Sequence, residues 1–245
     1  MDGYQLLLVC CAIALVAFLY SSVGHAGASG YIAVMSLFGF AAAVIRPTAL
    51  ILNVLVACIG TIQFWRAGHF SWKLFWPFAL LSVPAAYAGG YLPVSPSLFK
   101  ILLGAVLLVS AFRLFLHQQD PTQVHRPQWP TALSVGALIG FLAGLTGTGG
   151  GIFLTPLILF CRWGRTRQAA AVSVAFILVN SLAGLVGYVS SGQPLPPFAE
   201  LLAVAAIGGG FLGSHFGSRR FPARVVQLLL AVVLLIAGLK LLLSL

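Results

Sequence analysis

The sequence predicts an all-α integral membrane protein made of two inverted-topology halves, each with about five apolar segments. Three observations predict this class: an extreme apolar composition, features that recur in the same order in both halves, and basic residues that favour one side of the membrane. Of the 245 residues, 60% are hydrophobic and 7% are charged, and the mean hydropathy is +1.07. A soluble domain needs more charge to stay dispersed, so the lipid bilayer is the predicted environment.

The first predicted element is an N-terminal membrane segment. The stretch MDGYQLLLVCCAIALVAFLY has an acidic residue and no Lys or Arg before its apolar run. A secretory signal peptide opens with a basic region, so this stretch fits a first membrane segment better.

Further apolar segments follow along the whole chain. The predicted segments are 4–20, 31–45, 47–65, 74–92, 98–116, 131–145, 152–161, 168–190, 198–216 and 225–244. Segments 31–45 and 152–161 are shorter than the ~20 residues that a helix needs to cross a bilayer. We therefore predict short or re-entrant helices there, each after a glycine-rich break.

The second half repeats the features of the first. KILLGAVLLVSAFRLFL from Lys100 aligns with QLLLAVVLLIAGLKLLL from Gln227, and GGYL from Gly89 matches GGFL from Gly209. Each half also has a glycine-rich break before its second segment. The polar stretch 117–130 is the predicted linker, which gives membrane repeats at 1–120 and 121–245.

The basic residues test the topology. If every segment crosses and the N-terminus lies outside, ten basic residues lie inside, and three, Arg46, Lys100 and Lys240, lie outside. If only 31–45 and 152–161 fail to cross, the split is eight to five, so the positive-inside rule favours the first arrangement. The inner set is Arg66, Lys73, Arg113, Arg126, Arg162, Arg165, Arg167, Arg219, Arg220 and Arg224.

This arrangement gives each half an odd number of crossings. The halves are then inverted with respect to each other, as in many secondary transporters, and both termini lie outside. Two re-entrant hairpins would leave the split unchanged. The net charge of +10 is therefore interpreted as topological, and no nucleic-acid partner is expected.

The glycine-rich break of the second half, in GLTGTGGGIFLTP (144–156), predicts a loop that opens a helix inside the protein. The first amides of that helix, roughly 149–153, would be unpaired at the positive end of the helix dipole. Glycine lets an anion approach such amides closely. The counterpart in the first half is SSVGHAGASG (21–30), and inverted halves would bring the two breaks to one central site.

Polar residues in and around the breaks complete the candidate site. The candidate substrate-binding residues are Ser22, His25, Ser29, Gly30, Asn53, Thr146, Thr148, Gly149, Gly150, Gly151, Thr155 and Asn180. Each asparagine has an alternative interpretation as interhelical glue, because an amide in lipid must find a partner. His25 could carry a coupling proton or could cap a helix.

Other residues are interpreted structurally. The small-residue faces Gly136-xxx-Gly140-xxx-Gly144 and 209–217 allow close helix packing. Arg46 is taken as a topology marker with no further role. The four cysteines form no CxxC and accompany no His cluster, so neither a metal site nor a cofactor is expected.

The scarcity of acidic residues bears on the substrate. The acids are Asp2, Asp120 and Glu200, all at segment ends or in the linker. No carboxylate lies in mid-membrane to bind sodium or to carry a proton in a cation pump. An anionic substrate is therefore favoured over a cation.

GLTGTGGGIFLTPLILF, its degenerate first-half copy and the closing GGGFLGSHFGSRRFPARVVQLLLAVVLLIAGLKLLL together resemble the sulfite exporter TauE/SafE family. The resemblance implies a permease of the bacterial inner membrane that moves sulfite, sulfonates or related small organic anions. The motif covers Gly147, Gly149, Gly150, Gly151 and Pro156. The first copy departs from it, with Val34 and Met35 where a proline is expected and His25 and Ala26 within the glycine run.

Two rival functions are considered. GASG (27–30) fits the GxSG of rhomboid-type intramembrane serine proteases, and His215 could be the base for Ser29. This requires the two side chains within hydrogen-bond reach and leaves the repeat unexplained. The second rival function is that of a membrane scaffold that transports nothing. The preferred interpretation is a secondary anion carrier that works by alternating access and is not an enzyme.

Overall fold

A computed structural model describes residues 3–93, 95–115, 123–196 and 199–217, with isolated positions in 231–243. All the regular structure of these residues is helical, which confirms the predicted all-α integral membrane protein. The helices are α1 (Gly3–Ser22), α2 (Ala28–Leu37), α3 (Ala42–Arg66), α4 (Trp72–Tyr91), α5 (Pro96–Phe115), α6 (Trp129–Thr146), α7 (Gly151–Phe160), α8 (Thr166–Ser190) and α9 (Ala199–Gly217). Most of the last predicted segment, 225–244, and linker residues 117–122 lie outside the described residues.

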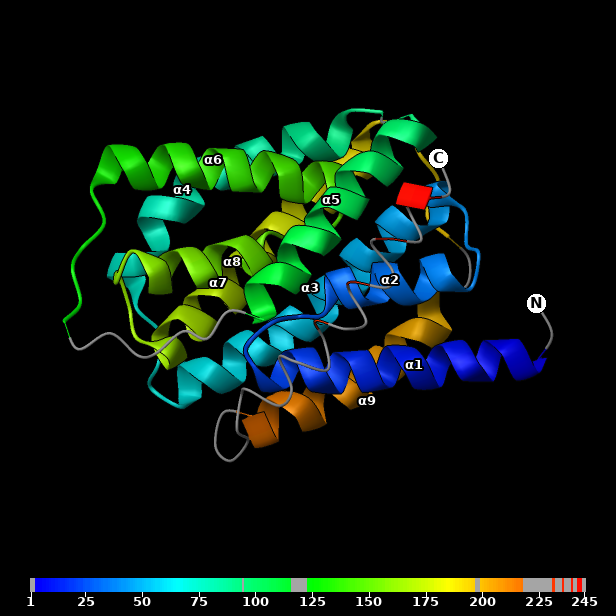
Figure 1. Ribbon diagram of the computed structural model, residues 1–245, viewed down its shortest axis with the longest axis horizontal. Helices are drawn as coiled ribbons and strands as arrows, with labels where there is room; N and C mark the ends of the chain where they lie inside the picture. Colours follow the sequence, from blue (N-terminus) through cyan, green and yellow to red (C-terminus); the bar gives the residue numbers. More distant parts are fainter. Residues whose placement is uncertain are drawn as a thin grey trace.

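Four of the described helices, α1, α3, α6 and α8, are long and apolar enough to cross a membrane. Their lengths pair across the two halves, with 20 and 18 residues for α1 and α6 and 25 each for α3 and α8. In Figure 1, α1 and α3 run from the N-terminal end of the bundle toward the other end, and α6 and α8 run in the opposite direction. The described helices therefore form two sets of opposite direction, as inverted repeats do.

The short helices α2 and α7 have ten residues each. Ten helical residues extend about 15 Å, half the thickness of a bilayer core. After each break the chain turns back, so that α2 and α7 return toward the end where the preceding helix began (Figure 1). A hydrogen bond of 2.8 Å from the His125 amide to the Arg162 carbonyl joins the lead into α6 to the end of α7. The pairs α1–α2 and α6–α7 are thus helical hairpins with their tips inside the bundle.

The boundary between the second and third segments differs from the prediction. Segment 31–45 ends as a helix at Leu37, and α3 begins at Ala42, so that Pro47 lies inside α3. A proline removes one backbone donor, here the amide that would pair with the Ala43 carbonyl. The Tyr188 hydroxyl on α8 donates to that carbonyl at 3.3 Å instead. A tertiary contact thus lets the helix continue through a residue that usually ends one.

Glycine brings the two halves into close contact. On α6, a Cβ added to Gly136, Gly140 or Gly144 would overlap backbone carbonyls of α4. On α9, Gly209 and Gly213 meet carbonyls of α1 in the same way. The predicted packing role of these residues is confirmed, and the two helix pairs α4–α6 and α1–α9 occupy corresponding places in the two halves.

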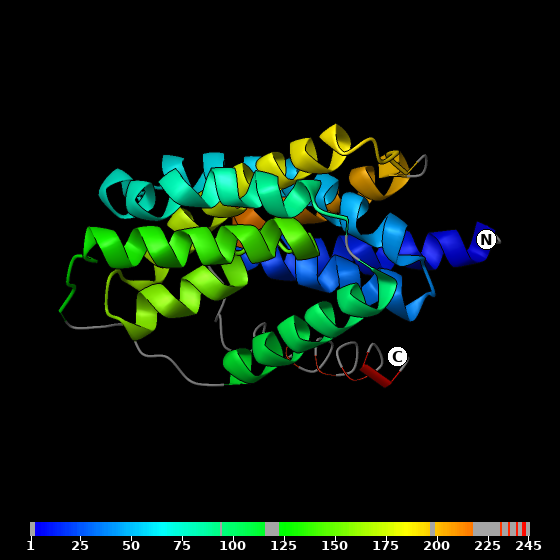
Figure 2. The ribbon, with the colours of Figure 1, turned by 90° about the horizontal axis from the view of Figure 1, so that it is seen from above.

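The core lies between the long helices. One cluster of buried apolar side chains centres on α1, α2 and α3, and another on α4, α6, α7 and α8. Figure 2 shows α5 lying obliquely along one side of the bundle. Large apolar side chains are exposed on many helices, among them Tyr4, Phe112, Leu138 and Phe160, as expected of a surface in contact with lipid.

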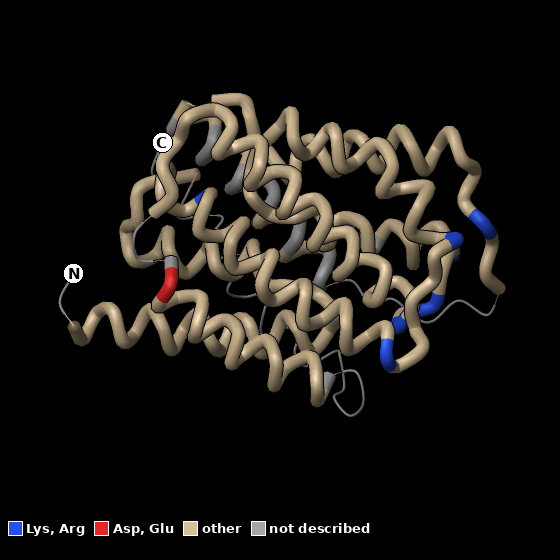
Figure 3. Tube along the Cα trace, turned by 180° about the vertical axis from the view of Figure 1, so that it is seen from behind, with Lys and Arg blue, Asp and Glu red and all other residues tan. Residues whose placement is uncertain are grey.

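Charge is unevenly distributed along the bundle. Figure 3 shows that Lys and Arg residues of the described part gather at the end opposite the N-terminus. They come from the end of α3, the start of α4, the lead into α6, the α7–α8 connection and the start of α8, and all belong to the predicted inner set. Arg46, near the start of α3, does not belong to this group and is buried.

Candidate functional site

The break before α7 has left-handed backbone at three glycines. The φ angles are 79° at Gly147, 72° at Gly149 and 81° at Gly150. L-amino acids with a side chain rarely adopt this region, so the sequence TGTGGG permits the turn. Residues 146–151 are all buried. The break is therefore enclosed by protein and does not face lipid.

The amides that open α7 have no protein acceptor within the described part of the chain. The amides of Phe153 and Leu154 both pair with the Gly150 carbonyl, at 3.1 and 3.2 Å. Those of Gly149, Gly150, Gly151 and Ile152 donate to no backbone carbonyl. The sequence predicts unpaired amides at 149–153. The structure has one fewer, because the Phe153 amide is already hydrogen-bonded. Unpaired amides and the positive end of the helix dipole coincide at a buried position.

Two long helices bring polar side chains to this break. A Cβ on Gly149 would lie 2.8 Å from both Asn53 Nδ2 of α3 and Ser181 Oγ of α8. Asn53 donates to Ser181 at 3.2 Å, and both residues are fully buried. Asn53 Oδ1 has no hydrogen-bond partner. Gly149 thus brings the backbone of the break into close contact with a polar pair that comes from both halves.

The first break has the same construction with different residues. Gly24 and Gly27 have φ angles of 79° and 105°, and α2 begins directly after Gly27. The amides of residues 26–30 donate to no backbone carbonyl in the described chain, whereas the Tyr31 amide pairs with the Gly27 carbonyl at 2.9 Å. A second set of unpaired donors therefore lies at the start of α2.

The two breaks meet at His25. Its Nδ1 lies 3.3 Å from the Val23 carbonyl oxygen, and its ring is also within hydrogen-bonding reach of the Gly151 backbone. The Tyr20 ring meets it edge-on, with centroids 6.5 Å apart. The N-terminal ends of α2 and α7, one from each half, thus come together inside the protein.

The remaining candidates have local partners. The Ser22 hydroxyl donates to the Leu19 carbonyl at 2.7 Å, and Ser29 shares a 2.8 Å hydrogen bond with Tyr20. Gly30 packs against α1 side chains. All three residues thus bond to groups of α1 or pack against it.

On the second half, the threonines and Asn180 behave differently. Thr146 donates to the Leu142 carbonyl at 2.7 Å and lies 2.9 Å from the Thr148 hydroxyl. Asn180 Nδ2 donates to the Phe176 carbonyl of its own helix at 2.9 Å. Buried oxygens without a partner remain on Asn180, Thr155 and Ser173. The interior thus has unused acceptors and donors beyond the breaks.

Ser181 was not among the predicted site residues. It follows Asn180 in FILVNSLAG, and the pair is unusual because it places two polar side chains in succession in an apolar segment. That signal was available in the sequence. The sequence does not show, however, that Ser181 faces the break and Asn180 does not.

The interpretation of Arg46 as a topology marker is wrong. The side chain is 6% exposed and donates to carbonyl oxygens at the ends of α4 and α6. Nη2 lies 2.6 Å from Gly89 O, 2.7 Å from Gly90 O and 3.0 Å from Gly144 O, and Nη1 lies 3.2 Å from Leu92 O. The guanidinium also lies 5.5 Å from the Tyr188 ring centroid. Arg46 is buried because four backbone carbonyls and an aromatic face replace its water.

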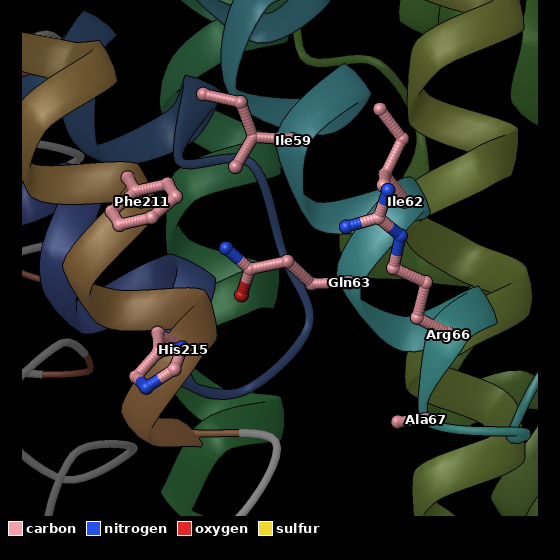
Figure 4. Close-up of a pocket in the computed structure, with 7 residues that line it drawn as sticks. All are labelled: Ile59, Ile62, Gln63, Arg66, Ala67, Phe211 and His215. Atoms are coloured by element: carbon pink, nitrogen blue, oxygen red, sulfur yellow. The ribbon is translucent and has the colours of Figure 1, made fainter.

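The hydrogen-bonded pair of Ser29 and His215 that the rival protease interpretation requires is not formed. Ser29 is 2% exposed, and its hydroxyl is bonded to Tyr20. His215 of α9 lines a half-open pocket of ≈ 540 Å³ between α3 and α9 (Figure 4). Figure 4 shows Gln63 between His215 and Arg66, with Ile59, Ile62 and Phe211 above them. Ser29 does not line this pocket.

Comparison with known proteins decides the family. The family described as "Sulfite exporter TauE/SafE" matches residues 9–241. The chain belongs to the TauE/SafE family. The "Probable membrane transporter protein y4hK" of Sinorhizobium fredii is 42% identical over 94% of this chain and 96% of its own length. The "Probable membrane transporter protein YjnA" of Bacillus subtilis is 29% identical over 89% and 92%, respectively.

More distant relatives have similar names. The "Probable membrane transporter protein MJ0441" of Methanocaldococcus jannaschii is 25% identical over 80% of this chain and 78% of its own length. No solved structure matches the chain. The TauE/SafE protein is thus a multi-pass membrane transporter and not an enzyme.

Proposed function

We propose that this TauE/SafE protein carries small anions, such as sulfite, sulfonates or related organic anions, by alternating access. The supporting observation is the meeting of two helix N-termini, each with unpaired amides, at His25 and Gly151. The anion binds to the amides of Gly149, Gly150 and Gly151. Thr148, Ser29 and His25 lie close by.

The energetics favour an anion at this position. A hydrogen bond to a charged group contributes about 1.5–3 kcal/mol. Several such bonds offset the cost of several kcal/mol of removing a small anion from water. The dipoles of α2 and α7 add to this, because both direct their positive ends to the same place.

The surrounding charges support the same substrate class. Among the residues that the structure describes, Glu200 is the one Asp or Glu, and it lies in the first turn of α9. A cation would therefore find no carboxylate beside the breaks in this part of the chain. Asn53 and Ser181 are neutral, and their hydroxyl and amide N–H groups can donate to an oxyanion.

The opposite orientation of the two halves is consistent with a carrier that works by alternating access. Each half provides one half-helix to the centre, and the two half-helices come from hairpins of opposite direction. Movement of one half against the other would open the site to either side in turn, as in other transporters with inverted repeats. The end with the gathered Lys and Arg residues is proposed to face the cytoplasm of a bacterial inner membrane, which puts the N-terminus outside.

A Gly149→Ala variant tests the site. A methyl group there would overlap Asn53 Nδ2 and Ser181 Oγ, each 2.8 Å away, and would displace the amides that are proposed to bind the anion. We expect uptake of labelled sulfite and of a labelled sulfonate into proteoliposomes to fall at least about tenfold, as expected when ~1.4 kcal/mol of binding is lost.

Gly39→Ala is the matched control. Gly39 has a φ of 78°, so an alanine there has similar backbone strain, but its Cβ would meet nothing within 4 Å. The control should transport like the unmodified protein. Equal flux in the Gly149 and Gly39 variants would refute the assigned site, and wild-type protein that moves no anion would favour a scaffold.

A further inference from the structure

His25 differs from its counterpart in the other half. It lies two residues before Gly27, the N-cap of α2, and Thr148 lies two residues before Gly150, the N-cap of α7. The two breaks also pack alike, because Gly24 lies against Ala170 of α8 and Gly147 lies against Arg46 of α3. A residue that can take up a proton near neutral pH is thus present in only one of two corresponding positions.

The surroundings of His25 leave it without a charged partner. Tyr20 of α1 faces its ring, and Tyr31 of α2 donates its hydroxyl to the Ala26 carbonyl at 2.6 Å. From α7 the Gly151 backbone approaches, and from α8 an alanine packs against the same turn. The charged side chain near the other break is Arg46, which packs against Gly147. Its guanidinium donates hydrogen bonds to carbonyl oxygens of α4 and α6. No Asp or Glu of the described chain interacts with the His25 ring.

The hydrogen bonds of the ring indicate which nitrogen is available. With Nδ1–H donated to the Val23 carbonyl, Nε2 is the basic atom. The ring is partly buried and adjoins both sets of unpaired amides. An imidazolium at this point is stabilised by an adjacent anion, and the anion by the imidazolium. Each therefore favours the binding of the other.

We propose that His25 binds the proton that accompanies the anion, so that the protein carries one proton with each monovalent anion. This rests on the proposed anion transport. A proton from the water on the entry side adds to Nε2, and the anion binds beside the imidazolium on the amides of α7. After the site opens to the other side, the anion leaves and the Nε2–H bond releases its proton to water. One positive and one negative charge cross together, so no net charge moves.

A neutral pair has a physical advantage in a lipid-embedded site. A lone anion that crosses a low-dielectric interior incurs the full desolvation penalty, whereas a paired ion recovers part of it as Coulomb attraction. Thr148 cannot supply the compensating charge, because a hydroxyl does not take up a proton near neutral pH.

The test uses full-length protein in liposomes with the membrane voltage clamped at zero, and ¹⁴C-ethanesulfonate as the probe. A sulfonate remains a monoanion over the pH range, so a pH effect comes from the protein. With the outside one pH unit more acidic, wild-type protein should accumulate the probe about tenfold, the equilibrium ratio for one proton per anion. His25→Gln should abolish accumulation, and any remaining exchange of labelled for unlabelled ethanesulfonate should no longer depend on pH.

His69→Gln is the matched control, because His69 lies in the α3–α4 connection at the end of the bundle. It lies away from both glycine-rich breaks, so it has no role in the proposed site. This variant should accumulate the probe like the wild type. A pH-sensitive dye inside the liposomes provides a readout without any variant: an ethanesulfonate gradient should drive protons in the direction of the anion.

The outcomes separate the two proposals. Accumulation by His25→Gln equal to wild type, or wild-type ethanesulfonate flux without proton movement, would overturn the proton role and leave anion transport intact. Exchange by His25→Gln that keeps the pH dependence of the wild type would also overturn it, since the proton would then bind elsewhere. Wild-type protein that moves no ethanesulfonate would overturn both.

Discussion

The Arg46 side chain joins the start of α3 to the ends of two other helices. The last carbonyls of a helix have no partner within the helix and carry the negative end of its dipole. Arg46 donates to such carbonyls on α4, at Gly89 and Gly90, and on α6, at Gly144. Because Gly144 lies only three residues before Gly147, the guanidinium fixes the position from which the second break departs.

We expect an Arg46→Met variant to be less stable than the wild type. Methionine fills similar space but leaves several buried carbonyls unpaired, each at a cost of about 1–3 kcal/mol. The apparent midpoint of thermal unfolding in detergent should fall by roughly 5–10 °C. Arg46→Lys should recover only part of this loss, because one ammonium cannot reach two helix ends as a planar guanidinium does.

Arg66→Met is the comparison variant for this measurement. Arg66 ends the same helix and is exposed, so its replacement should move the midpoint very little. Coincident midpoints for the Arg46 and Arg66 variants would contradict the stabilising role of Arg46.

Prediction of single residues from the sequence succeeded where a property depends on the residue type alone. The glycines at 147, 149 and 150 permit left-handed backbone, and the turn is where the sequence places it. Arg46 could not be assigned, because its partners are backbone carbonyls that every residue has. The roles of Asn180 and Ser181 could not be told apart either. Asn180 bonds to a backbone carbonyl of its own helix, whereas Ser181 accepts a hydrogen bond from Asn53.

At the scale of elements, glycine faces determine how the halves join. Gly140 of α6 lies against the Ser82 carbonyl of α4, and Gly213 of α9 lies against the Phe18 carbonyl of α1. Backbone contacts of this kind cannot yield as a flexible side chain can. The distance between the paired helices is therefore set by residues that have no side chain.

Gly140→Ala and Gly213→Ala should each destabilise the protein, by about 1–3 kcal/mol or more, because the added methyl group overlaps a carbonyl of the neighbouring helix. The free energy of unfolding in detergent, or the thermal midpoint, measures this. Gly208→Ala is the control, since a Cβ there meets nothing within 4 Å on the same helix as Gly213. Loss of stability in the control as well would point to helix propensity or lipid contact instead of interhelical overlap.

Helix boundaries were harder to predict than helix identity. The number and order of apolar segments up to α9 agree with the structure, but the sequence predicts the start of the third segment at Pro47, whereas α3 begins at Ala42. The sequence rule is correct that proline usually begins or ends a helix. It fails here because Tyr188, far away along the chain, bonds to the carbonyl that Pro47 leaves unpaired.

At the scale of the whole molecule, the bundle has two unlike ends. The connections around Gly39 and Gly192 lie at the N-terminal end, and the α3–α4 connection around Gly68 lies at the end with the gathered basic residues. All three glycines are exposed, have φ angles of 76–78° and have open space around them. They therefore form a matched set of positions for labelling.

Single cysteines at these positions test the orientation in a background without Cys10, Cys11, Cys58 and Cys161. A membrane-impermeant maleimide added to intact cells should label Gly39→Cys and Gly192→Cys and spare Gly68→Cys. Inside-out vesicles should give the reverse. Labelling of all three from the same side would contradict the inferred topology.

Gly147 of the second break packs against Arg46, whereas Gly24, at the corresponding position of the first break, packs only against Ala170. The two breaks are therefore held in place by different contacts. If the transport cycle exchanges the shapes of the two halves, its two end states are not mirror equivalents. The state that keeps all the Arg46 hydrogen bonds lies lower in energy, so the empty protein would rest facing one preferred side of the membrane and would begin each round from there.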